Sequence, residues 1–184
     1  IPQGDWSSDV CSSDLVHRNG AFEHQNGAIN ALRTESGASE RRPDTMFVGE
    51  YNHTMDAKGR IFMPAKMRDG LSEQFYIARG IDKCICVYPE SEWQKISEKF
   101  SSYSQTDTRH ARRSVFSSAD CGTLDSQGRL MLAPKYQQYA GLGKDVVVVG
   151  NNTCIEIWST EGWAEEQKYF DNELVEKELI GLGF

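Results

Sequence analysis

The sequence predicts an α+β fold, mainly β, that is built from two pseudo-symmetric modules with short flanking helices. Two observations lead to this prediction. A pentapeptide of the form Asp-x-x-Gly-Arg occurs at residues 56–60 and again at 125–129, and short apolar segments bounded by turn residues surround both copies, as is typical of strands. A repeat much longer than the units of solenoid proteins indicates two copies of one small domain.

The similarity of the two copies extends beyond the pentapeptide. Asp56, Gly59 and Arg60 recur 69 positions later, whereas Pro64 recurs 70 positions later. Ala133 is therefore an insertion in the second copy. Further residues that recur at the offset of 70 are Gly80 with Gly150, Cys84 with Cys154, Trp93 with Trp163 and Phe100 with Phe170.

The first module, residues 46–100, is predicted to contain two strand pairs and two helices. Residues 50–54 and 60–63 are expected to form a hairpin, because an Asp at the first and a Gly at the last position of the turn suit the chain reversal. A short helix at 65–69 follows Pro64, since proline costs little at a helix start. The remaining elements are strands at 75–79 and 83–88 and a helix at 89–100.

Residues 101–114 are polar and are predicted to form a linker helix, after which the second module, residues 115–184, repeats the order of the first. Its elements are a hairpin of strands at 115–123 and 130–132, a short helix at 134–139, and strands at 145–150 and 153–158. One long, acidic final helix is expected, with Ser159 as its N-cap. Its apolar stripe consists of Trp163, Phe170, Leu174 and Leu179.

Residues 1–45 differ from the rest of the chain, because they show no hydrophobic period and are rich in Ser, Gly, Asn and Arg. Residues 4–15 resemble translated adapter sequence, so we exclude the segment from the fold. We interpret residues 1–45 as a non-native or disordered leader, an untranslated region read through in frame, with Met46 as the natural start. The alternative is a disordered arm in which Arg41 and Arg42 touch a polyanion.

Composition and charge limit the possible functions. No apolar run approaches the roughly 18 residues of a membrane span, so no membrane partner is expected. Five cysteines without zinc-ribbon spacing fit a reducing cytosol. The formal net charge is −7, and residues 156–178 contain eight acidic residues against two lysines. This acidity argues against a non-specific nucleic-acid binder, although it is compatible with a few arginines on one face.

The turn residues divide into two groups by their expected roles. Asp56 and Gly59, like Asp125 and Gly128 in the second copy, are interpreted as structural, because a turn aspartate usually accepts backbone N–H groups. The arginines that follow, Arg60 and Arg129, either pair with those aspartates or meet a ligand. A guanidinium held by an aspartate can still donate to phosphate or to guanine, so binding is favoured over a purely structural ion pair.

Other polar side chains near the motifs are unevenly distributed between the modules. The first hairpin is expected to be surrounded by Lys58, Lys66 and Arg68, whereas the second offers only Gln127 and Lys135. If this face binds DNA, the first module should make most of the phosphate contacts.

No enzymatic activity and no cofactor are expected, because no nucleophile, metal-ligand set or phosphate loop is apparent in the sequence. Cys84 and Cys86 are interpreted as small core residues rather than metal ligands. Trp93 and Trp163 are interpreted as core anchors of equivalent helices.

Three segments of the sequence resemble the MraZ family, whose members are bacterial regulators of the division and cell-wall gene cluster. The segments are residues 46–49 (Met-Phe-Val-Gly), residues 56–66 and the second motif at 125–129. The resemblance covers residues 46–184. It implies tandem SpoVT-AbrB-like modules that form a swapped-hairpin β-barrel, and closed rings of many subunits. It also implies a cytoplasmic, nucleoid-associated protein that binds double-stranded DNA at short G-rich direct repeats upstream of its own operon.

By this resemblance Arg60, Arg129 and their hairpin neighbours contact DNA. The second motif has Gln127 where the first has Lys58, so the two sites do not carry the same charge. We therefore expect the second site to bind DNA more weakly. Two alternatives stay open. One is a ring-forming protein-interaction scaffold that uses the acidic C-terminal helix, and the other is an AbrB-like antitoxin.

Overall fold

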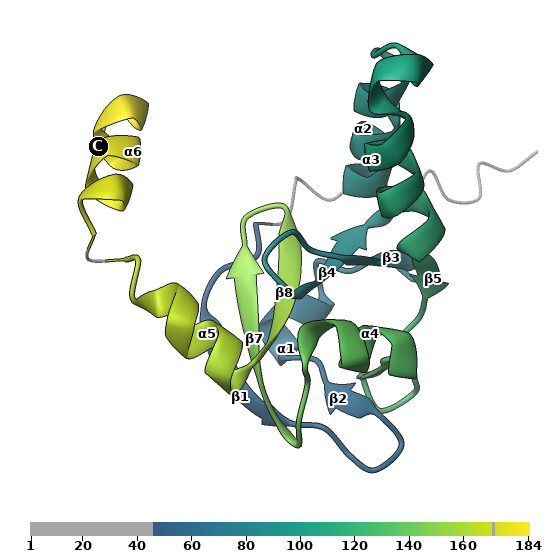
Figure 1. Cartoon of the computed structure of the whole chain (residues 1–184). Helices are drawn as coiled ribbons and strands as arrows, with labels where there is room; N and C mark the ends of the chain where they lie inside the picture. The colour runs from purple at the N-terminus through teal and green to yellow at the C-terminus, as the bar shows by residue number, and fades with distance from the viewer. Residues whose placement is uncertain (1–45, 171) are drawn as a thin grey trace, which may run out of the picture. The chain divides into compact units, whose positions relative to one another are not determined.

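The computed structural model describes residues 46–170 and 172–184, so the interpretation of residues 1–45 lies outside the described residues. Along this part of the chain each pair of strands is followed by one or two helices (Figure 1). The strands are β1 (Glu50–Thr54), β2 (Arg60–Phe62), β3 (Phe75–Arg79), β4 (Ile85–Pro89), β5 (Asp120–Gly122), β6 (Arg129–Met131), β7 (Asp145–Asn151) and β8 (Cys154–Ser159). The helices are α1 (Ala65–Arg68), α2 (Glu90–Ser101), α3 (Gln105–Ser118), α4 (Pro134–Ala140), α5 (Thr160–Gln167) and α6 (Glu173–Leu182).

The strands form one large sheet and one small ribbon. The large sheet has the order β1-β7-β8-β4-β3-β5, and β2 pairs with β6 in the two-stranded ribbon. Every pairing is antiparallel. The predicted combination of helices and strands in two repeats is confirmed, and the structure adds that the sheet is antiparallel.

The two repeats exchange their first strands. β1 of the first repeat pairs with β7 of the second, and β5 of the second repeat pairs with β3 of the first. Both expected turns are present, but the prediction that the strands on either side of each turn pair with each other is wrong. In the first repeat, a single isolated bridge between Met55 and Ile61 is the pairing that joins the two sides of the turn. The reason is burial, because Ile61 opposite Leu130 in the ribbon allows both side chains to face one shared core.

The main core lies between the large sheet and the ribbon, with α1 and α4 closing it. Alternate residues of the central strands point into it, and both repeats contribute. Its central members are Ile61, Phe75, Ile85, Val87, Leu130, Tyr136, Val146, Val148, Ile155 and Ile157. The buried Tyr136 hydroxyl lies within hydrogen-bond distance of the carbonyl oxygens of Ile77 (2.9 Å) and Ser118 (2.7 Å), and its one proton is shared between them, which ties α4 to the sheet.

Helices α2, α3 and α5 cover the outward face of the large sheet. Trp93 of α2 stacks on Tyr76 with ring centroids 5.0 Å apart, and Trp163 of α5 packs against Trp158 at 5.6 Å. Both tryptophans are buried, so their interpretation as core anchors of equivalent helices is confirmed.

Two predicted elements differ from the structure. Residues 115–118, predicted as part of a strand, end α3, because Phe116 packs edge-on against Trp93 (5.5 Å) and Phe100 (5.4 Å) from a helical position. The single long final helix is wrong as well. Phe170 instead packs against Trp163 after α5 has ended, and a new helix, α6, begins after its own N-cap, Asn172.

None of the helices in the described part of the chain is long and apolar enough to cross a membrane.

Candidate nucleic-acid interface

The first Asp-x-x-Gly-Arg turn is closed by its aspartate. The Asp56 carboxylate accepts the backbone N–H groups of Lys58 (2.9 Å) and Arg60 (3.0 Å) through Oδ1. The Gly59 N–H donates to the Asp56 carbonyl (2.9 Å), and Gly59 adopts a φ of 76°. This left-handed conformation is the physical reason for a glycine at the fourth position.

The second turn has the same geometry. The Asp125 Oδ1 atom accepts the N–H groups of Gln127 and Arg129, both at 2.9 Å, and Gly128 also has a φ of 76°. The two turns are therefore equivalent in backbone and in aspartate role. The structural interpretation of the aspartates and glycines agrees with these contacts.

Each arginine is anchored to its own turn. Arg60 Nε donates to Asp56 Oδ2 at 2.7 Å, and Arg129 Nε donates to Asp125 Oδ2 at 2.7 Å. The side-chain hydrogen bond from Arg60 is the largest of the effects that lower the pKa of Asp56 to about 2. Hydrogen bonds from the backbone and side chain of Arg129 lower the pKa of Asp125 in the same direction. Both carboxylates therefore stay charged, and both guanidinium groups are held in a fixed orientation.

The β2–β6 ribbon presents both arginines on one outward face. Ile61 and its partner Leu130 are buried, so their neighbours along each strand point the other way. This outward face consists of Arg60, Phe62, Arg129 and Met131. Phe62 is 51% and Met131 60% exposed, and the Arg129 guanidinium lies 5.7 Å from the centre of the Phe62 ring. A two-stranded ribbon thus carries two oriented cations beside two exposed apolar groups.

The structure places Arg68 against the second turn rather than the first. A β-carbon placed on Gly128 would lie 2.5 Å from Arg68 Nη1. In the equivalent position at the first turn, a β-carbon on Gly59 would lie close to Gln137 Nε2, which donates to the Leu132 carbonyl at 2.7 Å. The expected clustering of Lys58, Lys66 and Arg68 around the first turn is therefore wrong for Arg68.

The remaining predicted residues occupy different surroundings. Lys58 and Gln127 are exposed within their turns, and Lys66 is exposed on α1. Lys135 forms an ion pair with Asp120 Oδ2 at 2.7 Å, which also lowers the pKa of Asp120. Lys135 is thus partly neutralised, whereas the two turns offer their polar side chains to solvent.

Sequence reasoning did not identify Phe62, Met131 and Gln137 as neighbours of the arginines. Alternation about the apolar Ile61 and Leu130 could have placed Phe62 and Met131 on the arginine face. Nothing local in the sequence indicates Gln137, because its contact with the first turn depends on the exchange between the repeats.

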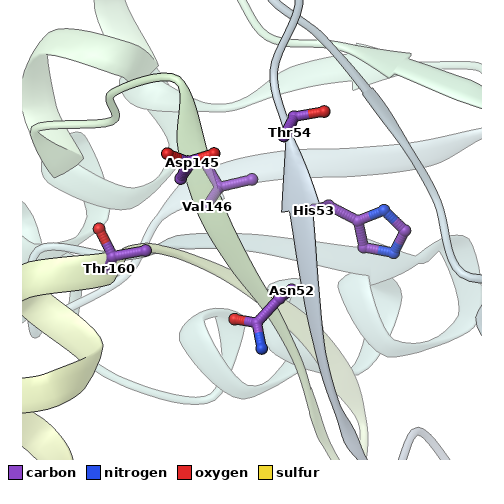
Figure 2. Close-up of a pocket in the computed structure, with 6 residues that line it drawn as sticks. All are labelled: Asn52, His53, Thr54, Asp145, Val146 and Thr160. Atoms are coloured by element: carbon purple, nitrogen blue, oxygen red, sulfur yellow. The ribbon is translucent and has the colours of Figure 1, made fainter.

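A shallow hollow lies elsewhere, at the β1 edge of the large sheet (Figure 2), with a volume of about 360 Å³. Asn52 and His53 lie next to each other on β1 and project to opposite sides of that strand, as Figure 2 shows. Burial lowers the pKa of His53. Asp145 also lines this hollow, and among residues 46–170 and 172–184 no hydrogen bond joins its carboxylate to His53.

A family model described as "MraZ protein, putative antitoxin-like" matches residues 46–114 and 115–179. The chain is 42% identical over 142 residues to the "Transcriptional regulator MraZ" of Syntrophomonas wolfei, which covers 75% of this chain and 99% of that protein. It is 46% identical over 120 residues to the protein of the same name from Carboxydothermus hydrogenoformans, with coverage of 64% and 84%.

Proposed function

The chain belongs to the MraZ family, and from this membership we propose that it is a DNA-binding transcriptional regulator whose β2–β6 ribbon contacts double-stranded DNA. The relatives from Syntrophomonas wolfei and Carboxydothermus hydrogenoformans carry the name transcriptional regulator. The proposed role is binding without catalysis.

The single observation that carries the proposal is the outward face of the ribbon. The major groove of DNA admits a two-stranded β-ribbon, and an arginine fork matches the O6 and N7 acceptors of guanine. Arg60 and Arg129 stand at equivalent positions on this face, each oriented by its turn aspartate. An oriented guanidinium loses less conformational freedom on binding than a free one, so it can contribute more to affinity.

Lys58, Lys66, Arg68 and Gln127 are proposed as contacts to the DNA backbone at the edges of this face, and Lys135 as a weaker one because Asp120 holds it. The position of Arg68 changes the balance between the repeats. The first turn carries Lys58, and the second has Arg68 beside it. We therefore propose that both turns contribute to binding to a similar extent.

The finer features of the proposal are the target and the assembly. We propose short G-rich direct repeats upstream of the chain's own operon as the target, and a nucleoid-associated location. The strand exchange between repeats supports a swapped-hairpin, SpoVT-AbrB-like arrangement. A ring of subunits would place many weak arginine contacts on one face, so that an acidic chain could bind DNA by avidity.

A second candidate function is a protein-interaction scaffold, which one observation favours. Helix α6 has no buried residue, and its exposed apolar side chains include Leu174, Leu179 and Ile180. Such a surface suits a protein partner. The other alternative, an AbrB-like antitoxin, is itself a DNA-binding protein and differs from the proposed regulator in also binding a toxin.

Fluorescence anisotropy of the full chain on DNA from upstream of its own gene tests the proposal. Arg60→Ala and Arg129→Ala are each expected to weaken specific binding by about 1–3 kcal/mol, the usual range for a lost base contact. The matched control is Arg113→Ala, which removes one exposed arginine from α3 and should change little. Titrations at several salt concentrations separate phosphate contacts from base contacts.

Binding that is unchanged in the Arg60→Ala, Arg129→Ala double variant would contradict the proposed interface. If the same DNA shows no specific binding to the wild-type chain while a protein partner is retained by α6, the scaffold function stands instead. Mass measurement in solution determines whether the subunits form a ring.

A further inference from the structure

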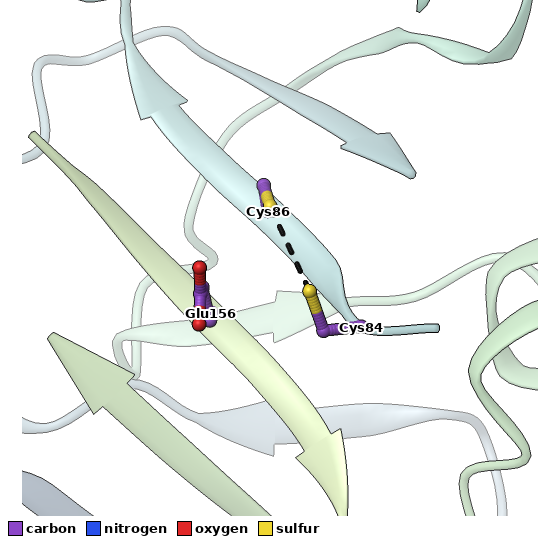
Figure 3. Close-up of side chains that lie close together, drawn as sticks. All are labelled: Cys84, Cys86 and Glu156. Atoms are coloured by element: carbon purple, nitrogen blue, oxygen red, sulfur yellow. Dashed lines mark hydrogen bonds between the residues drawn. The ribbon is translucent and has the colours of Figure 1, made fainter. Parts of the chain in front are cut away.

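Three cysteines and a glutamate lie together on the outward face of the large sheet, the face that looks away from the β2–β6 ribbon. We call Cys84, Cys86, Cys154 and Glu156 the thiol cluster. Cys84 immediately precedes β4, Cys86 lies on β4, and Glu156 stands directly opposite Cys86 on β8 (Figure 3). Cys154 is the first residue of β8, two positions before Glu156, so its side chain lies on the same face of that strand. The β4–β8 register therefore brings together donors from both repeats.

The distances in the cluster match those of a metal site. The Sγ atoms of Cys84 and Cys86 are 3.9 Å apart. These two sulfur atoms and one carboxylate oxygen of Glu156 all lie within 4.8 Å of one another. Two thiolates bound to one tetrahedral Zn²⁺ at about 2.3 Å each would be about 3.8 Å apart. The two sulfur atoms are thus already at the separation that such an ion needs.

The surroundings of Glu156 favour a cation. Its carboxylate accepts hydrogen bonds from Asn151 Nδ2 (2.7 Å) and Trp158 Nε1 (3.0 Å), which fix its orientation as the outer partners of metal ligands usually do. Among residues 46–170 and 172–184, no lysine or arginine forms an ion pair with it. The hollow beside it, about 310 Å³, is lined by two further acids, Asp82 and Glu166.

We propose that the thiol cluster binds one Zn²⁺ ion. Cys84, Cys86 and Glu156 supply three ligands, and Cys154 is the remaining thiol beside them. Thiolates select Zn²⁺ over Mg²⁺ or Ca²⁺, and the acidic hollow provides the entry path. Since β4 belongs to the first repeat and β8 to the second, the ion links the two repeats at the centre of the large sheet.

The test uses the full chain with Cys11→Ser and Cys121→Ser, which removes the two cysteines outside the cluster. The reduced, metal-free protein is titrated with Zn²⁺ against a chromophoric chelator, and separately with Co²⁺, whose absorption reports thiolate ligation and tetrahedral geometry. We expect one ion per chain and a thiolate-to-Co²⁺ charge-transfer band.

Cys86→Ser and Glu156→Gln should each weaken Zn²⁺ affinity by at least ~10–100-fold. Loss of a residue that only hydrogen-bonds to a metal ligand already lowers metal affinity by about that factor. Glu166→Gln, a matched change at the rim of the hollow, should have a much smaller effect. Circular dichroism verifies the fold of each variant. If Cys86→Ser does not fold, Glu156→Gln decides, because it keeps every thiol and nearly the same side-chain volume.

Three outcomes would overturn the proposal. One is no Zn²⁺ binding by the background protein, and another is Co²⁺ absorption without charge transfer. The third is binding that survives both Cys86→Ser and Glu156→Gln but is lost in Glu166→Gln, which would mean that only surface carboxylates hold the ion.

Discussion

Substitution of Gly59 by alanine should destabilise the protein more than the same change at Gly128, Gly141 or Gly143. At a φ of 76° the added methyl group strains the backbone by about 1–2 kcal/mol. It would also lie 2.9 Å from the Leu132 carbonyl oxygen and closer still to Gln137 Nε2. Because Gln137 must move, its 2.7 Å hydrogen bond to Leu132 is lost, which costs about 1 kcal/mol more. The expected total is about 2–3 kcal/mol.

The other three glycines separate these contributions. Gly143→Ala meets no neighbour within 4 Å and has no positive φ, so it should stay within about 0.5 kcal/mol of wild type. Gly141→Ala also meets no neighbour but has a φ of 61°, so it should show the backbone strain of about 1–2 kcal/mol alone. Gly128→Ala adds a clash with Arg68, an exposed side chain that can rotate away, so it should resemble Gly141→Ala.

Urea unfolding of the four variants measures these differences, and one fixed protein concentration is used so that any self-association adds the same stability to each variant. The expected order of destabilisation is Gly59→Ala, then Gly128→Ala and Gly141→Ala together, then Gly143→Ala. A cost for Gly59→Ala no greater than that for Gly141→Ala would refute the argued contact between Gln137 and the first turn.

Three further predictions concern single side chains. The pKa of the Asp56 carboxyl, followed by carbon-detected NMR, should be about 2 and should move back toward 3.8 in Arg60→Ala. Because the pKa of Asp56 is lowered in the folded state, its contribution to stability is present above about pH 4 and is lost as the pH falls toward 2. A titration midpoint that does not move in Arg60→Ala would contradict the role of Arg60. Tyr136→Phe should cost about 1–3 kcal/mol in thermal or urea unfolding, because the carbonyls of Ile77 and Ser118 lose the one hydroxyl proton that they share. Tyr103→Phe, at an exposed position, is the neutral control. Ser159→Ala should cost about 1 kcal/mol of stability, because the Gly162 N–H loses its 3.0 Å hydrogen bond to the Ser159 hydroxyl at the start of α5. Asn172→Ala should cost less, because the capping hydrogen bond of Asn172 is exposed and 3.4 Å long. Equal costs in urea unfolding would contradict this ranking.

Local residue patterns, together with the recurrence of landmark residues between the two copies, were sufficient to predict most of the element order. The strands at 75–79 and 145–150 and the helix after Pro64 lie where the pattern placed them, within a residue or two. The resemblance to the MraZ family was also confirmed. These features follow from local residue patterns that do not depend on which strand pairs with which.

The exchange of strands between repeats could not be predicted in the same way. Pairing β1 with β7 or with a strand of its own repeat buries the same alternate side chains, so the hydrophobic pattern does not distinguish the two. The positions of Arg68 and Gln137 against opposite turns depend on that exchange. The thiol cluster depends on the register of β4 with β8, which sets Cys86 opposite Glu156, so sequence spacing alone left Cys84 and Cys86 as ordinary core residues.

The exchanged strands also bear on how such a chain arose. A gene for one repeat would encode a polypeptide whose first strand has its partner in another molecule, so only a pair of identical chains would complete the large sheet. Joining two copies in one gene makes that pairing intramolecular and independent of concentration. It also frees the copies to diverge, and the lysine and glutamine at positions 58 and 127 are an instance of that divergence within otherwise matching turns.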